Sequence, residues 1–245
     1  MTPASGGPSP SAPPSTSCIP AASRQGSWTG LWAGGAVSSA QKGFMSCEGC
    51  YEHNFLLQMA MQAAKKSRRQ SAVAWLDLAN AFGSIPHHHM FATLGEFGIP
   101  ETFIQILQDL CKDCTTTTRT TDGETDTIPI RCGMKGGCPL SPIIFNLAME
   151  PLIPAVSGGS AGFDLHSKRI NILAYAEDLV LVADSSVSLQ RMLDIASDAA
   201  ECMGLRFNLK KWASLHVEGS ARALVRASQF LIQGKPMASL EEGEV

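Results

Sequence analysis

The stretch INILAYAEDLVLVAD, residues 170–184, constrains the fold more than any other part of the chain. Two apolar runs lie on either side of the acidic pair Glu177 and Asp178. Short runs of this kind, rich in aliphatic and β-branched residues, predict a β-hairpin with buried strands. Adjacent carboxylates repel each other, and folding does not require them at the tip of an apolar hairpin. The pair is therefore either a solvated turn or a functional feature.

A third carboxylate ends another apolar run. The sequence SAVAWLD, residues 71–77, predicts a buried strand that terminates at Asp77. If that strand lies beside the hairpin, Asp77 converges with the acidic pair at one edge of a sheet. Carboxylates this close are costly unless a cation neutralises them, and Mg²⁺ is the hard ion that is also shared with substrate phosphates. We therefore expect two-metal chemistry at phosphorus, although Asp77 alone also fits a residue that caps a turn.

Hydrophobic periodicity predicts a mixture of helices and hairpins in the rest of the chain. Apolar residues recur at helical spacing in five segments: 48–66, 87–97, 101–114, 143–153 and 186–203. The Thr-rich segment 115–130 predicts a hairpin around Asp122 and Gly123, and residues 205–211 and 213–217 predict short strands. Because strands and helices do not alternate strictly, we expect the α+β class.

Composition bears mainly on the domain boundaries. The chain has 245 residues, of which 44% are hydrophobic, so it can bury a sizeable core. Residues 1–36 begin with a Pro- and Ser-rich run that cannot order itself, and we expect a disordered or unassignable leader there. We expect residues 37–245 to form one domain. The net charge of -3 neither favours nor excludes a local basic groove, and no apolar run reaches the length of about 20 residues that spans a membrane.

The cysteines leave an alternative open. Two cysteine pairs, Cys47/Cys50 and Cys111/Cys114, have the C-x-x-C spacing of structural zinc ligands. The absence of an export signal favours reduced thiols instead. A zinc-stapled interaction protein is therefore one of the functions that the sequence allows.

Four sequence blocks resemble, in their order and spacing, those of reverse transcriptases from non-LTR (LINE-type) retrotransposons. The blocks are AWLDLANAFGSIPH, GMKGGCPLSPIIFNLAMEPL, LAYAEDLVLVAD and GLRFNLKKWASLHV, and AQKGFMSCEGCYEHNF resembles the fingers block just upstream. The resemblance runs from about residue 37 to at least residue 217. It implies a right-hand polymerase palm, built from an antiparallel sheet with packed helices, together with part of the fingers and without a thumb.

The resemblance also implies a metal site. Asp77, Glu177 and Asp178 match the catalytic, metal-binding acids, and the Leu78 carbonyl would complete the set. The implied cofactor is a pair of Mg²⁺ ions, which Mn²⁺ could replace. The implied partners are an RNA template, a DNA primer and deoxynucleotides, and the implied activity is RNA-directed DNA polymerisation.

Other matched positions imply a nucleotide pocket. Phe82 matches the aromatic residue that stacks under the incoming sugar and rejects a 2′-hydroxyl. Gly137, in the loop 133–142, and Tyr175, ahead of the acidic pair, match residues that line the nucleotide. Lys211 matches a lysine that protonates pyrophosphate, or it is a solvated lysine. Basic residues that fit phosphate contacts, or else a solvated helix end, are Lys42, Arg68 and Arg69.

Three positions depart from the family pattern. Glu177 stands where the family has aspartate, which keeps the charge but lengthens the side chain by one methylene. Gly136 replaces a glutamine, and Trp212 replaces a small residue and is expected to displace Lys211. These departures favour a second alternative, a catalytically inactive remnant that still binds nucleic acid.

Overall fold

The computed structural model describes residues 37–121, 123–134, 137–159, 161–219 and 224–240. Its centre is a five-stranded antiparallel sheet with the strand order β11-β10-β1-β9-β8. The strands are β1 (Ser71–Asp77), β8 (Ile172–Tyr175), β9 (Asp178–Ala183), β10 (Ala213–Glu218) and β11 (Leu224–Val225). Strand β1 is central and is buried along almost its whole length, as its apolar sequence predicts.

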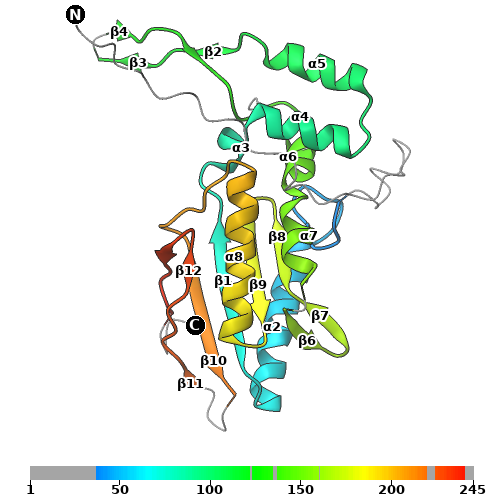
Figure 1. Cartoon of the computed structure of the whole chain (residues 1–245), viewed down its shortest axis with the longest axis vertical. Coiled ribbons are helices and arrows are strands. Elements are labelled where there is room, and N and C mark those ends of the chain that lie inside the picture. The colour runs from blue at the N-terminus through cyan, green and yellow to red at the C-terminus, as the bar shows by residue number, and fades with distance from the viewer. Residues whose placement is uncertain (1–36, 122, 135–136, 160, 220–223, 241–245) are drawn as a thin grey trace, which may run out of the picture.

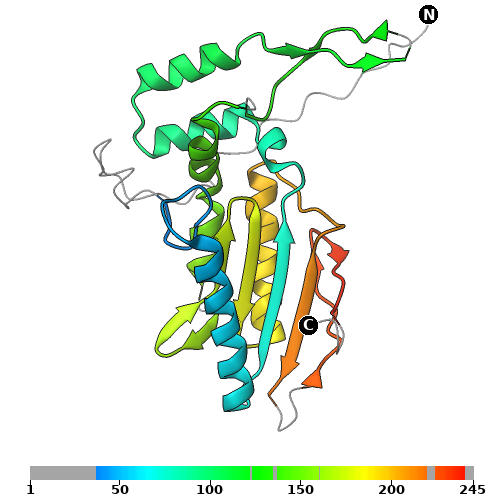
Figure 2. The same ribbon diagram turned by 180° about the vertical axis from the view of Figure 1, so that it is seen from behind.

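Helices cover both faces of this sheet. Helix α8 (Ser186–Cys202) packs on β1 and β9, and α7 (Leu152–Ser157) packs on β8 and α8. Helix α2 (Gly49–Ser67) lies on the opposite face, behind the sheet in Figure 1 and in front of it in Figure 2. Ser185 is the N-cap residue of α8, and its side chain accepts a hydrogen bond from the Ser188 N–H and so caps the first turn.

A second group of helices lies beyond the ends of the sheet where β1 finishes and β9 begins (Figure 1). It contains α3 (Ala81–Ser84), α4 (His87–Glu96), α5 (Glu101–Cys111) and α6 (Ser141–Met149). A thin two-stranded arm extends from α5 and is built from β2 (Thr115–Thr116), β3 (Arg119–Thr120), β4 (Gly123–Glu124) and β5 (Ile128–Pro129). Two small hairpins complete the fold: β6 (Phe163–Leu165) with β7 (Lys168–Ile170), and β12 (Leu231–Ile232) with β13 (Lys235–Pro236).

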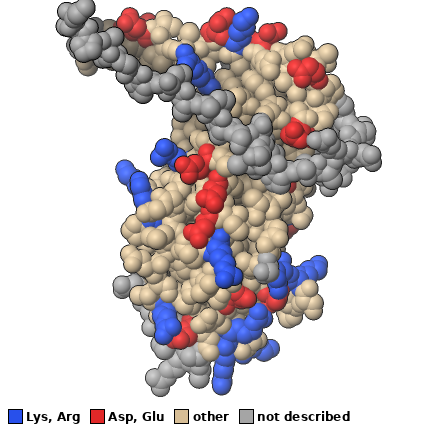
Figure 3. Space-filling model, viewed as in Figure 1, with Lys and Arg blue, Asp and Glu red and all other residues tan. Residues whose placement is uncertain are grey.

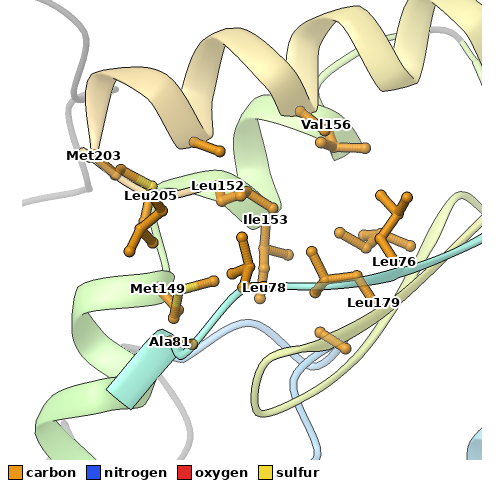
Figure 4. Close-up of a cluster of buried hydrophobic side chains, with 14 of the residues drawn as sticks. Leu76, Leu78, Ala81, Met149, Leu152, Ile153, Val156, Leu179, Met203 and Leu205 are labelled. Carbon is orange, nitrogen blue, oxygen red and sulfur yellow. The ribbon is translucent and has the colours of Figure 1, made fainter. Parts of the chain in front are cut away.

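Side chains alternate between the two faces along β1 and β9. Leu76 and Leu179 belong to the large core that the sheet shares with α6, α7 and α8 (Figure 4). Val73 and Val182 belong to a smaller cluster beneath α2. This period of two assigns Asp77 and Asp178, one residue beyond Leu76 and one before Leu179, to the face that α2 covers.

The predicted α+β class is confirmed by this mixture of helices and antiparallel strands. The predicted strand over residues 205–211 is wrong, because that segment holds only an isolated bridge between Phe207 and Leu78. The leader expected over residues 1–36 lies outside the described residues. None of the helices in the described part of the chain combines the length and the apolarity that crossing a bilayer requires.

Candidate active site

Two carboxylates face each other where β1 ends and β9 begins. The register of this antiparallel pair places Asp77 directly opposite Asp178. On the other side of β9, Tyr175 pairs with Asp178, so the tip of the β8–β9 hairpin consists of Ala176 and Glu177. Antiparallel neighbours stand about 5 Å apart, which brings carboxylates separated by a hundred residues of sequence into contact.

The loop between α8 and β10 supplies the counter-charge for Asp77. The Lys211 Nζ donates to Asp77 Oδ1 at 2.9 Å, and the Asn208 Nδ2 donates to Asp77 Oδ2 at 2.9 Å. Asp77 is only 7% exposed. Burial alone would raise its pKa, but the hydrogen bonds from Lys211 and Asn208 and the ammonium charge together lower the pKa of that carboxyl.

The pKa values of Asp178 and Lys211 are raised, in contrast to the lowered pKa of Asp77. Burial, followed by the charges of Asp77 and Glu177, raises the pKa of Asp178, and its carboxyl also hydrogen-bonds that of Asp77. The hydrogen bond to Asp77 and the charge of that carboxylate raise the pKa of Lys211, so its side chain is an ammonium at neutral pH. The site therefore combines an ionised Asp77, an Asp178 that holds its proton more tightly than usual, and the ammonium group of Lys211.

The donor set fits a hard divalent cation at two of the three acids. Carboxylate oxygens from Asp77 and Asp178 are the ligands that such ions prefer. Leu78 lies opposite Phe207 in an isolated antiparallel bridge. The hydrogen bonds of this bridge run from the Ala79 N–H to the Arg206 carbonyl and from the Asn208 N–H to the Asp77 carbonyl. The N–H and the carbonyl of Leu78 itself therefore point away from the segment around Phe207. Among the described residues, however, no three His, Cys, Asp or Glu side chains are placed to hold one ion, so Glu177 is not gathered with the two aspartates.

Aromatic rings stack just beyond the end of β1. Phe82, in α3, lies face to face with Phe145 of α6, with ring centroids 4.0 Å apart and an angle of 7° between the ring planes. The ring of Phe44 meets Phe82 edge-on at 5.7 Å. Phe82 is thus in contact with two other rings, and its position is set by packing.

Two further predicted pocket residues, Gly137 and Tyr175, have the following local geometry. Gly137 has a φ of +79°, in the left-handed region that favours glycine. Tyr175 is 39% exposed, and Cys50, through its charge and a hydrogen bond, raises the pKa of the Tyr175 hydroxyl. The substitution at Gly136 lies outside the described residues.

The structure bears on two expectations from the sequence: that Trp212 displaces Lys211, and that basic residues contact phosphate. Trp212 does not displace Lys211, because the indole is buried in the main core while the lysine still reaches Asp77. Lys42 forms an ion pair with Glu52 at 2.9 Å, and the Arg69 guanidinium lies over the Phe163 ring and donates to the Asp164 carbonyl. Lys42 and Arg69 therefore have partners within the protein. Sequence reasoning missed Asn208, and a polar residue in a predicted strand gave no signal for it.

The zinc alternative loses its geometric basis. Cys47 and Cys50 lie at the start of α2, whereas Cys111 ends α5 and Cys114 follows it. No group of metal-holding side chains forms from these pairs in the described part of the chain, and each of the four thiols is a free cysteine.

An antiparallel sheet flanked by helices, with paired carboxylates at adjoining strand ends, defines the palm class of nucleic-acid polymerases. The chain matches the family "Reverse transcriptase (RNA-dependent DNA polymerase)" over residues 31–234. It therefore belongs to the reverse transcriptase family, and the resemblance seen in the four sequence blocks is confirmed.

Curated relatives come from retrotransposable elements. The chain is 30% identical over 209 residues to the retrovirus-related Pol polyprotein of the type-2 element R2DM of Drosophila melanogaster, covering 82% of this chain and 19% of that protein. It is 31% identical over 195 residues to a Pol polyprotein of a type-1 element R2 of Popillia japonica, covering 78% of this chain and 27% of that protein. The chain thus spans about a fifth to a quarter of the length of these relatives.

Solved telomerase structures share the fold. The apo telomerase of Candida tropicalis truncated from its C-terminal domain aligns with a TM-score of 0.54 at 12% identity, covering 77% of this chain and 41% of that one. Telomerase from the same organism in complex with a fragment of telomeric RNA aligns with a TM-score of 0.54 at 11% identity, covering 76% and 31%. At this identity the likeness supports the palm fold alone.

Proposed function

We propose that this domain extends a DNA primer with deoxynucleotides on an RNA template, using two Mg²⁺ ions that Mn²⁺ can replace. The observation that carries the proposal is the contact of Asp77 with Asp178 across neighbouring strands, with Lys211 on the same carboxylate. Reverse transcriptases generally use divalent metal ions, and this donor set suits them. In this proposal the sheet with α2, α7 and α8 is the palm, and α3 to α6 with the β2–β5 arm belong to the fingers.

In this proposal some side chains bind the cations and another donates a proton to pyrophosphate. Asp77, Asp178 and the Leu78 carbonyl would hold the cations. Bound divalent ions would lower the pKa of the primer hydroxyl and neutralise charge on the triphosphate. The Lys211 side chain is 65% exposed, so its ammonium can turn from Asp77 to a phosphate oxygen and give a proton to the departing pyrophosphate.

The nucleotide would lie between these acids and the aromatic cluster. The stack on Phe145 holds the Phe82 ring in place, which lets it exclude a 2′-hydroxyl that would find no hydrogen-bond partner there. Tyr175 and Gly137 would line the same pocket. Each of these roles rests on the family pattern, and that of Tyr175 also on its pairing with Asp178 in the hairpin.

The charge distribution favours one face of the sheet for template and primer. The exposed residues of helix α8 include Asp194, Asp198 and Glu201. Figure 3 shows a column of acidic residues in the middle of the face that α8 occupies in Figure 1. A phosphate backbone is repelled by such a surface. The alternation along β1 and β9 directs Asp77 and Asp178 to the opposite face, so we place the template–primer duplex on that side of the sheet, beside α2 and at the strand ends that carry the two acids.

Primer extension on an RNA template tests the proposal. Asp77→Asn keeps the shape of the side chain but removes its charge, and we expect extension to fall by at least about a hundredfold. Asp198→Asn makes the same change on the acidic face of α8 and should leave extension unaltered. Equal extension by the wild type and Asp77→Asn would remove the catalytic role of Asp77.

The second candidate is a domain that binds nucleic acid without turnover. It is favoured by Glu177, which does not join the two aspartates in one metal-holding group. Filter binding of a template–primer duplex over a series of salt concentrations separates the two candidates. A steep salt dependence with no extension in Mg²⁺ or Mn²⁺ would support the second, because phosphate contacts release counterions whether or not chemistry follows.

A further inference from the structure

We propose that Gln41 is a positioning residue, which holds the tip of the acidic hairpin in place for catalysis through Ala176. The inference rests on the proposed polymerase function for its kinetic consequence. Its structural part, a clamp between two segments separated by 135 residues of sequence, is independent of that function.

The Gln41 side chain binds both polar backbone groups of Ala176. Its Oε1 accepts a hydrogen bond from the Ala176 N–H at 2.8 Å, and its Nε2 donates to the Ala176 carbonyl at 3.2 Å. The same Oε1 accepts a bond from the Gly43 N–H at 2.8 Å. Gln41 is only 2% exposed, so water cannot replace these bonds if the side chain is removed.

The clamp continues a backbone ladder that stops short of the turn. The Ala174 N–H donates to the Ala40 carbonyl, and the Lys42 N–H donates to the Ala174 carbonyl. Ala176 lies just beyond β8, and its N–H and carbonyl bond to the Gln41 side chain instead of to the backbone of that segment. The side-chain amide of Gln41 therefore takes the place of the missing peptide group and extends the ladder to Ala176.

Ala176 needs such support because of its backbone conformation. Its φ is +52°, in the left-handed region that costs a residue with a Cβ about 1 kcal/mol or more. A side chain that binds both its N–H and its carbonyl favours this one conformation over the alternatives. Since Glu177 and Asp178 follow directly, the conformation of Ala176 sets where their carboxylates lie.

The segment that carries Gln41 is itself wedged against the turn. A Cβ built on Gly43 would lie 2.3 Å from the Ala176 nitrogen, so glycine is required for this close approach. The Gly43 carbonyl accepts a hydrogen bond at 2.8 Å from the buried Asn146 Nδ2 in α6. The turn is thus braced from α6 through Gly43 as well as by Gln41.

Hydrogen exchange tests the clamp without any assay of activity. Gln41→Met keeps the approximate volume of the side chain but removes its hydrogen bonds, and we expect backbone amides of residues 174–179 to exchange about tenfold faster. Glu150→Met is the matched control, because Glu150 Oε1 accepts a bond from the Ser38 N–H in the same segment but takes no part in the clamp on Ala176. Unchanged exchange at residues 174–179 in Gln41→Met would overturn the proposal.

Steady-state kinetics test the positioning role. For Gln41→Met we expect kcat for nucleotide addition to fall by about 10- to 100-fold while the Kd for template–primer stays within about twofold of the wild type, because a displacement near 1 Å costs this much in catalysis. Glu150→Met should keep the wild-type kcat at temperatures below its unfolding. A parallel loss of kcat and of template–primer binding in Gln41→Met would mean a general structural defect and would also overturn the proposal.

The two assays separate the failure of this inference from the failure of the proposed function. If the wild type does not extend a primer at all, the polymerase proposal fails and the exchange experiment still decides whether Gln41 holds the turn. If Gln41→Met proves too unstable to purify, Gln41→Glu keeps the oxygen that accepts from Ala176 and Gly43, replaces the Nε2 donor to the Ala176 carbonyl by an oxygen and adds a charge when it ionises. That variant should also show faster exchange at the same residues, and an exchange rate equal to that of the wild type would contradict the clamp.

Discussion

The extra methylene of Glu177 is a single-residue feature with a measurable consequence. Among the described residues, Glu177 and the two aspartates do not form one metal-holding group, and the extra methylene moves the Glu177 carboxylate further from the backbone than an aspartate carboxylate would lie. We expect Glu177→Asp to raise kcat for primer extension by about 10- to 100-fold. Glu177→Gln serves as the control for charge and should lower kcat or leave it unchanged. A decrease in Glu177→Asp would show that the longer side chain is the functional one.

Glu150 makes the stability of the domain depend on pH. Burial raises its pKa to about 7, although the hydrogen bond from the Ser38 N–H acts in the opposite direction. Ionisation of this carboxyl is less favourable in the folded protein than in the unfolded chain. The free energy of unfolding therefore falls as the pH rises from about 4.5 to about 7. The difference between those pKa values corresponds to about 3 kcal/mol.

Urea denaturation of Glu150→Gln checks this expectation. The amide cannot ionise, so the free energy of unfolding of the variant relative to the wild type should rise by up to about 3 kcal/mol between about pH 5 and about pH 8. The absolute stability can be lower at acidic pH, because the second Glu150 oxygen is buried without a hydrogen-bond partner among the described residues. Parallel pH curves for the two proteins would contradict the assignment.

At the scale of elements, α8 shows how a periodic stripe becomes a packed surface. Its buried residues are Leu189, Met192, Leu193, Ala196 and Ala200. They follow the helical period and face β1, β9 and α7. The acids on the exposed side of the same helix keep that face in water.

Paired substitutions test the division between the two sides of α8. Leu193 is 0% exposed and belongs to the main core, so Leu193→Ala should lower the free energy of unfolding by about 2–5 kcal/mol. Ile195, two residues on, is 36% exposed, and Ile195→Ala should cost less than about 1 kcal/mol. Equal losses measured by chemical denaturation would mean that α8 packs on a different face.

At the scale of the whole molecule, the dispersed cysteine pairs predict that zinc does not hold the fold together. Since the described residues contain no group of three or more His, Cys, Asp or Glu side chains placed for one metal ion, a strong chelator should leave the Tm of the purified chain within about 2 °C of the untreated protein. A large fall in Tm on chelation, restored by stoichiometric Zn²⁺, would revive the zinc-stapled alternative. The same measurement in excess Mg²⁺ separates zinc from the cations proposed at Asp77 and Asp178.

Several features were determined by the sequence alone. The helical and strand periods predicted α2, β1, α4, α5, α8 and the β8–β9 hairpin close to their observed bounds, because those periods are local properties of the chain. The four ordered blocks identified the family, since chemistry at phosphorus demands particular residue types at particular spacings. Asp77 and Asp178 were candidates on the same grounds.

The tertiary structure decided what the local pattern does not contain. The register of β1 against β9 placed Asp77 opposite Asp178 and left Glu177 outside that pair, and strand register depends on the whole sheet. The bonds of Asn208 and Lys211 to Asp77, and the clamp of Gln41 on Ala176, join segments more than 130 residues apart. Periodicity along the chain carries no information about such contacts, because they form only when the folded sheet brings these distant segments together.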